Sequence, residues 1–173
     1  MGIATLVAHA ALLVASSSTS HPDADLSTID GTINELYAVI SRTTPGTRDW
    51  DRFKALFDPH ARIILNRNPN TARAGSDFFS LSTDDYRTQN EKYFLENPFV
   101  EKELHRDTMV YGGIAQVLST YELKAGLAPA EWTATGVNMI QLYFKDGRWF
   151  IQGIVFRPSD QNNPIPARLL PPR

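Results

Sequence analysis

The spacing of apolar residues changes partway along this chain of 173 residues. Ile33, Leu36 and Ile40 recur at intervals of three and four residues, which is typical of one buried helix face. Between residues 100 and 157 apolar residues instead alternate in four closely spaced runs, rich in β-branched and aromatic side chains. This order predicts an α+β fold shaped as a cone, in which a bent antiparallel sheet wraps around N-terminal helices.

Capping and turn residues set the expected bounds of these elements. A first helix is expected over residues 29–42 with Asp30 as its N-cap, and a shorter one over residues 50–57 after Asp49. Ser82 is expected to begin a third helix. The predicted strands cover residues 61–65, 100–111, 114–123, 132–144 and 149–156, and residues 66–80 form a loop.

Composition excludes several classes of function. The 17 Lys and Arg residues nearly balance the 19 Asp and Glu residues, and no basic run occurs, so nucleic acid is not an expected partner. Cysteine is absent, which removes disulfides, thiolate nucleophiles and thiolate metal sites. The length fits one domain, expected at residues 25–158, and a Pro-rich tail at residues 159–173 that is extended or disordered.

The first twenty residues differ in kind from the rest of the chain. An apolar run at residues 3–15 precedes a small, polar run at residues 16–20, which predicts a signal peptide over residues 1–20. A mature chain beginning between Ser16 and Ala24 would be secreted or periplasmic. The run is too short for a stable membrane span. The alternative is an N-terminal helix on a cytoplasmic domain.

Four short motifs carry a family resemblance. They are RDWDRF at residues 48–53, STYE at 119–122, NMIQL at 138–142 and DGRW at 146–149. Together they resemble the nuclear transport factor 2-like superfamily, and especially its SnoaL-like bacterial members of unassigned function. The resemblance covers residues 29–157. It implies that the cone between the sheet and the first helices is the ligand-binding or active site.

Two enzyme branches of that superfamily allow comparison by residue. Tyr37 matches the tyrosine that ketosteroid isomerases place on their first helix, but the aspartates expected near Leu65 and Ile140 are absent, which argues against steroid isomerisation. His105 and Asn138 approximate the histidine and asparagine of scytalone dehydratases. The tyrosine–aspartate pair and the second histidine of that branch have no counterparts here.

His105 is the candidate general acid or base, because imidazole titrates near neutral pH. It belongs to an alternating polar set with Glu101, Glu103 and Asp107. If this set faces the cone, a carboxylate can orient the imidazole; if it faces water, the set is an ordinary solvated strand face. The other histidines lie in segments with no reason to converge on His105, so no metal site is expected.

The remaining candidates are polar or apolar groups of the expected cavity. Asn138 shares a strand face with Ile140 and Leu142, and its amide either orients a ligand or ties the sheet to the first helix. Tyrosine hydroxyls are expected at the rim of the pocket. They belong to Tyr37, Tyr86, Tyr93 and Tyr121.

The sequence therefore predicts a pocket for a small, largely hydrophobic organic molecule, with no cofactor. If the protein is an enzyme, the resemblance implies proton transfer in an isomerisation, dehydration or cyclisation, with His105 as base and Asn138 and Tyr37 as orienting groups. The alternative is a non-catalytic module that binds a partner or forms a homodimer. The outer sheet face that carries Met139, Gln141 and Tyr143 would form the homodimer interface.

Overall fold

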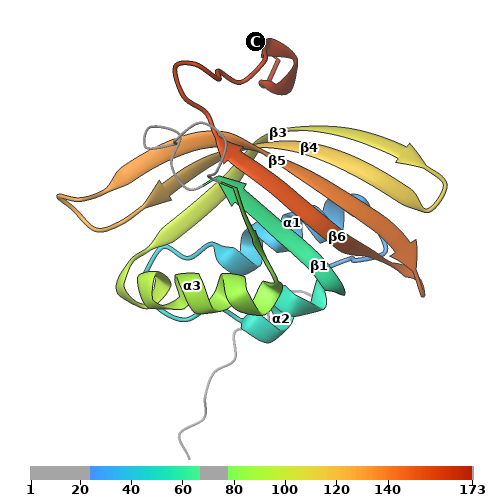
Figure 1. Ribbon diagram of the computed structural model, residues 1–173, viewed down its shortest axis with the longest axis horizontal. Coiled ribbons are helices and arrows are strands. Elements are labelled where there is room, and N and C mark those ends of the chain that lie inside the picture. The colour runs from blue at the N-terminus through green and yellow to red at the C-terminus, as the bar shows by residue number, and fades with distance from the viewer. Residues whose placement is uncertain (1–23, 67–77, 173) are drawn as a thin grey trace, which may run out of the picture.

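A curved sheet covers three helices in the computed structural model, which describes residues 24–66 and 78–172 (Figure 1). The helices are α1 (Ile29–Ile40), α2 (Trp50–Ala55) and α3 (Thr83–Glu96). The strands are β1 (Phe57–Asn66), β2 (Phe78–Leu81), β3 (Phe99–Tyr111), β4 (Ile114–Ala125), β5 (Trp132–Lys145) and β6 (Arg148–Pro158). The predicted α+β class and bent sheet are confirmed.

The six described strands lie in the order β2-β1-β6-β5-β4-β3. Strands β3 to β6 form an antiparallel meander, whereas β1 runs parallel to β6. The sheet is therefore mixed, because β1, the strand expected at residues 61–65, is parallel to its neighbour β6. β1 begins earlier than expected because Phe57 is buried and pairs with Ile151, so Asp58 and Pro59 belong to the strand and do not simply end the helix.

The helix caps largely follow the sequence. Asp49 caps α2 by accepting a hydrogen bond from the backbone of Arg52, and Ser82 and Asp85 form a capping box at α3. The N-cap of α1 is Thr28, whereas the sequence indicated Asp30. Asp30 lies two residues later, in the first turn of α1, where its carboxylate accepts a hydrogen bond from Arg106 on β3.

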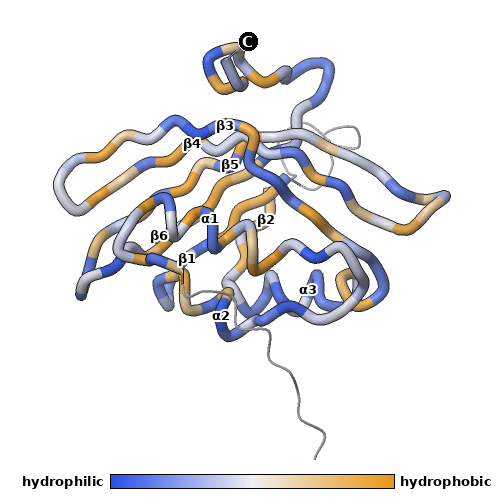
Figure 2. Tube along the Cα trace, turned by 180° about the vertical axis from the view of Figure 1, so that it is seen from behind, coloured by the Kyte–Doolittle hydropathy of each residue, from blue (hydrophilic) through white to orange (hydrophobic). Residues whose placement is uncertain are grey.

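The core fills the space between the sheet and the helices. Apolar and polar residues alternate along the strands, so one sheet face is apolar (Figure 2). Trp50 stacks on Phe94, and Phe53 packs edge-on against Trp50. Phe94 is the only residue of α3 that is fully buried, so this helix closes the core mostly with partly exposed side chains.

The C-terminal tail folds back onto the sheet instead of staying extended. A short 3-10 helix, η1 (Ala167–Leu169), lies on the convex face, the side of the sheet away from the helices (Figure 1). Leu169 is only 4% exposed, and its carbonyl accepts a hydrogen bond of 2.6 Å from the hydroxyl of Thr120. One buried leucine thus orders a segment whose proline content suggested disorder.

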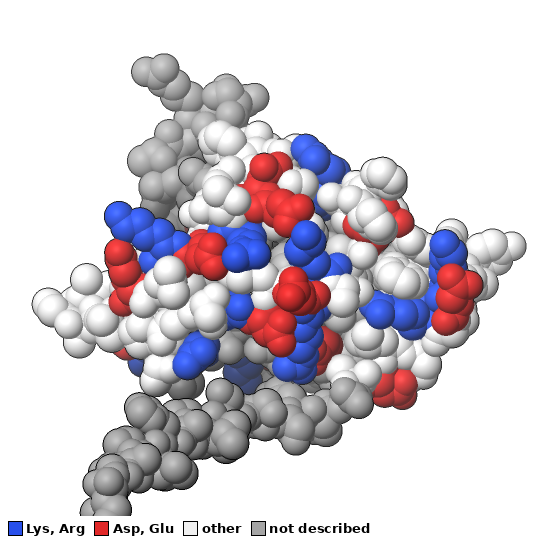
Figure 3. Space-filling view, turned by 90° about the horizontal axis from the view of Figure 1, so that it is seen from below, with Lys and Arg blue, Asp and Glu red and all other residues white. Residues whose placement is uncertain are grey.

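The expected signal peptide lies outside the described residues, so export stays a prediction. Among the helices described, none has the length and apolar character needed to cross a membrane. On the side of the molecule that carries the helices, acidic and basic residues are interspersed (Figure 3).

Candidate functional site

A cavity of about 1010 Å³ opens between the concave sheet face and helices α1 and α3. Its volume matches that of pockets that hold small organic molecules. Its apolar lining includes Leu36, Ile40, Phe53, Phe94, Phe99 and Leu123. An aromatic body would therefore fit its walls better than a charged one.

Three polar side chains from three different elements meet on one wall of this cavity. The amide nitrogen of Asn138 on β5 lies 3.0 Å from the hydroxyl oxygen of Tyr37 on α1. The same nitrogen lies 3.0 Å from Oε1 of Glu101 on β3. All three residues line the cavity. Asn138 thus holds a carboxyl group in a fixed place against an apolar space.

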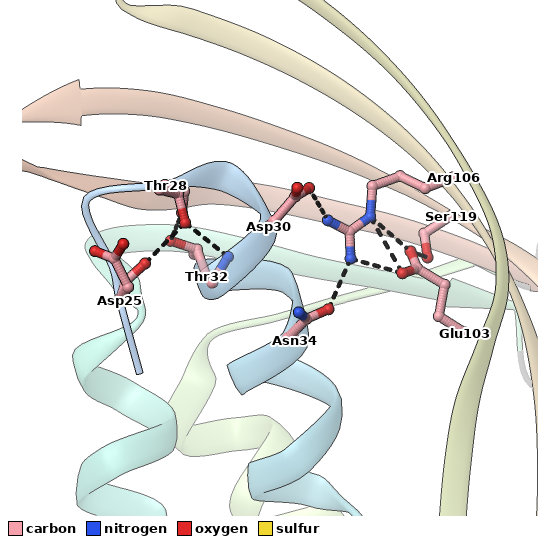
Figure 4. Close-up of polar contacts among 9 residues, drawn as sticks. Asp25, Thr28, Asp30, Thr32, Asn34, Glu103, Arg106 and Ser119 are labelled. Carbon is pink, nitrogen blue, oxygen red and sulfur yellow. Dashed lines mark hydrogen bonds and ion pairs between the residues drawn. The ribbon is translucent and has the colours of Figure 1, made fainter. Parts of the chain in front are cut away.

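A second chain of polar contacts extends from Tyr37 to the protein surface. The Tyr37 hydroxyl lies 2.6 Å from Oγ of Ser119, which donates a hydrogen bond to Glu103. Arg106 donates to both carboxylate oxygens of Glu103, and its guanidinium also contacts α1 (Figure 4). The partners of Arg106 on α1 are the side chains of Asp30 and Asn34.

Burial changes the proton affinity of the groups in this wall. It raises the pKa of the Glu101 carboxyl to about 7, although the hydrogen bond from Asn138 lowers it in part. Burial also raises the pKa of each of three cavity tyrosines, to which the charge of Glu101 contributes. These are Tyr37, Tyr86 and Tyr121. Glu101 therefore exchanges its proton near neutral pH, while these tyrosines keep theirs.

A glycine makes room for one of these tyrosines. Gly136 on β5 lies opposite Tyr121 on β4. A Cβ atom at Gly136 would collide with the Tyr121 hydroxyl and with the carbonyl of Arg157. The missing side chain leaves the space that the phenol group of Tyr121 occupies.

Most of the predicted site residues lie at the cavity. Tyr37, Asn138, Tyr86, Tyr93 and Tyr121 all line it, and the hydroxyl of Tyr93 accepts a hydrogen bond of 3.1 Å from Trp132. Two expected lining residues do not reach the cavity surface and belong to the packed core. They are Ile140 and Leu142.

His105 does not lie with this group. The alternation expected for β3 breaks at a β-bulge between Glu103 and His105. His105 pairs with Thr120, whose hydroxyl points to the tail on the convex face, whereas Arg106 pairs with Ser119 and points inward. The extra residue of the bulge, Leu104, moves His105 to the opposite face of the sheet from Glu101.

The carboxyl group of Glu101 is the functional candidate that the sequence did not single out. The sequence placed Glu101 in the alternating polar set of β3, but only as a carboxylate that could orient His105. Its signal was the apolar context, since Glu101 pairs with Leu123, which also lines the cavity. Among residues 24–66 and 78–172, no three His, Asp or Glu side chains lie close enough to hold a metal ion.

Neither a protein-family model nor a curated protein matches this chain. Solved structures do match it in fold. An NTF2-like protein from Cytophaga hutchinsonii superposes with a TM-score of 0.56 at 10% identity, over 76% of this chain and 95% of that one. A candidate scytalone dehydratase from Novosphingobium aromaticivorans gives a TM-score of 0.59 at 13% identity, over 76% and 82% of the two chains.

A third similar structure shares the same architecture. It is a candidate calcium/calmodulin-dependent kinase II association domain from Exiguobacterium sibiricum, with a TM-score of 0.58 and 10% identity. The match covers 82% of this chain and 98% of that chain. Together with the curved sheet and the cavity beneath it, these likenesses confirm that the chain adopts the nuclear transport factor 2-like fold.

Proposed function

We propose that the cavity binds a small organic molecule with an aromatic or otherwise apolar body, and that Glu101 transfers a proton to or from it without a cofactor. The observation that carries this is the Glu101 carboxyl, which faces a largely apolar cavity, is held by Asn138 and has a pKa near 7. A group whose pKa lies near the working pH is best placed for proton transfer. The dehydratase description of one similar structure supports the same chemistry.

The two forms of Glu101 would do complementary work. The carboxylate accepts a proton from a hydroxyl or from an acidic carbon of the ligand, and the acid returns a proton to another atom or to a leaving hydroxyl. Isomerisation, dehydration and cyclisation all need such a step. Tyr86 and Tyr121 line the same cavity and stay neutral, so they are available as hydrogen-bond donors to a ligand oxygen.

The roles of the other polar residues follow from their contacts. Asn138 fixes the carboxyl of Glu101, and Tyr37 fixes Asn138, so both act as positioning residues. The proton-transfer role moves from His105 to Glu101, because the bulge in β3 turns His105 away from the cavity.

The experiment uses 2-naphthol, a fluorescent molecule with an aromatic body and one hydroxyl. Its binding is measured by fluorescence titration between about pH 6 and about pH 8. Binding to the wild-type protein should tighten as Glu101 ionises, because the carboxylate accepts a stronger hydrogen bond from the naphthol hydroxyl than the neutral acid does. Glu101→Gln should bind about tenfold more weakly at the upper pH and show no pH dependence.

The matched control is Glu96→Gln, the same change at an exposed position on α3. It should bind 2-naphthol as the wild type does at every pH. If Glu101→Gln keeps both the affinity and the pH dependence of the wild type, Glu101 is not the group that meets the ligand.

We also infer that the convex face forms a homodimer interface. Met139 and Val155 are opposite each other on β5 and β6, and the two residues are 50% and 40% exposed. Gln141 is exposed and Tyr143 half-buried on the same strand. An exposed apolar pair in the middle of a sheet face is unusual for a surface that meets only water.

Light scattering at micromolar concentration tests this inference. The wild type should run as a dimer and Met139→Glu as a monomer, because the added charge would be buried in the interface. Leu127→Glu, at a similarly exposed leucine after β4, is the control and should leave the dimer intact. A monomeric wild type would contradict the inference.

A further inference from the structure

We propose that Glu103, held by Arg106, sets the orientation of the Asn138 amide and thereby decides which protonation state of Glu101 the cavity favours. Glu103 and Arg106 are positioning residues in this scheme, since neither lines the cavity. This inference rests on the proposed function, because control over the protonation state of Glu101 matters only if Glu101 exchanges a proton with a ligand.

The first step is the ion pair at the outer end of the chain. Nε of Arg106 lies 3.0 and 3.1 Å from the two carboxylate oxygens of Glu103, and Nη2 lies 2.6 Å from one of them. Asp30 and Asn34 hold the guanidinium from the other side (Figure 4). A carboxylate bound in this way to a guanidinium can only accept hydrogen bonds.

The carboxylate of Glu103 determines which way the hydroxyl groups of Ser119 and Tyr37 donate their protons. Because Glu103 can only accept, Ser119 donates its single proton to Glu103. Ser119 must then accept in its 2.6 Å contact with Tyr37, so Tyr37 donates. The proton of Tyr37 is thereby used, and its oxygen can only accept from its remaining neighbour.

The hydroxyl of Tyr37 in turn fixes the orientation of the Asn138 amide, which contacts the carboxyl group of Glu101 in the cavity. The remaining neighbour of Tyr37 is Asn138, so the nitrogen of its amide, and not the oxygen, must face Tyr37. The same nitrogen lies 3.0 Å from Oε1 of Glu101 and donates to it. The charge of Glu103 therefore ensures that Glu101 receives a donor, which favours its ionised form.

Without the charge on Glu103, the hydrogen bonds that link Ser119, Tyr37 and Asn138 would be free to exchange donor and acceptor. Tyr37 could then donate to the carbonyl of Asn138, and the turned amide would place that carbonyl near Glu101. A carbonyl next to a carboxyl group favours the protonated acid, because the acid can donate to it and the carboxylate cannot. The expected result is a rise in the pKa of Glu101.

The other titratable groups around Glu101 do not produce this effect. Tyr37 on α1, Tyr86 on α3 and Tyr121 on β4 all have raised pKa values and stay neutral where Glu101 titrates. Arg48 acts electrostatically on Tyr86 and is held by backbone carbonyls, and Glu122 lies exposed at the cavity rim. Neither changes when Glu103 is replaced.

The test is a pH titration of the side-chain carboxyl carbon of Glu101 by carbon-13 NMR in the protein without ligand. The resonance is identified by its absence in Glu101→Gln. We expect Glu103→Gln and Ser119→Ala each to raise the midpoint by about one pH unit. The midpoint in the double variant should be no higher than in Ser119→Ala alone, because both changes break the same series of hydrogen bonds. Asp107→Asn, at an exposed acid on the same strand, should leave the midpoint unchanged.

The sign of the shift separates this mechanism from simple electrostatics. Removing a nearby negative charge through space would lower the midpoint of Glu101, whereas reversal of the chain raises it. A lowered or unchanged midpoint in Glu103→Gln would overturn the inference, as would a further rise when Glu103→Gln is added to Ser119→Ala. Ser119→Ala introduces no charge and removes one oxygen, so it remains informative if Glu103→Gln does not fold. Since no ligand is present, this outcome is independent of 2-naphthol binding.

Discussion

Asn138 donates a hydrogen bond of 3.0 Å to Glu101 across β4, the strand that separates their own strands in the sheet. The two side chains converge because the sheet is curved and both project from its concave face. Their meeting places an ionisable group inside a mainly apolar cavity, where desolvation makes its charge costly. The proposed chemistry depends on this relationship.

The stability of the protein should depend on pH through Glu101. Its pKa is about 7 in the folded protein against an ordinary value of 4.5, so between these values the folded state binds a proton that the unfolded state has lost. The contribution of Glu101 to the free energy of unfolding should therefore be greatest below about pH 4.5 and fall as pH rises to about 7, by about 1.4 kcal/mol for each pH unit and about 3.5 kcal/mol in total.

Urea unfolding at several pH values measures this contribution. Glu101→Gln should remove that part of the slope and be more stable than the wild type at about pH 8, because it carries no charge into the cavity. Parallel stability curves for the two proteins would contradict the expectation.

His105→Ala should leave ligand binding almost unchanged. The side chain lies on the convex face, paired with Thr120, and does not line the cavity. We expect the affinity for 2-naphthol to stay within about twofold of the wild type across the pH range, since no direct contact is lost. A tenfold loss of affinity would show that His105 contacts the ligand, which would require β3 to continue without the bulge at Leu104.

The C-terminal tail should contribute measurably to stability. Leu169 is 4% exposed, so Leu169→Ala removes a buried side chain and should cost about 2 to 3 kcal/mol in urea unfolding. The neighbouring Leu170 is 41% exposed, so Leu170→Ala should cost less than about 0.5 kcal/mol. Equal effects of the two changes would mean that the tail does not pack on the sheet in solution.

Much of the fold could be predicted from local patterns. The Asp146-Gly147 hairpin has positive φ angles of 51° and 82°, as its residue types indicated. Alternation also placed Asn138 on the inner face, because β5 is regular on both sides of that position against β4. Both features depend on a few neighbouring residues, which a sequence displays directly.

The errors arise where long-range packing overrides a local rule. The bulge at Leu104 has no Gly or Pro to mark it, so regular alternation wrongly placed His105 with Glu101. Leu169 looked like part of a Pro-rich tail because its burial depends on a distant strand. The contact between Glu101 and Asn138 depends on sheet curvature, which no short segment encodes.

The proposed function requires that Glu101 titrates near neutral pH and meets the ligand. Carbon-13 NMR of its carboxyl carbon, in wild-type protein with and without saturating 2-naphthol, tests both parts together. We expect a midpoint near pH 7 in the free protein and a lower one in the complex, because a ligand that binds the carboxylate more tightly must lower its pKa. A midpoint near 4.5 that does not move when 2-naphthol binds would contradict it.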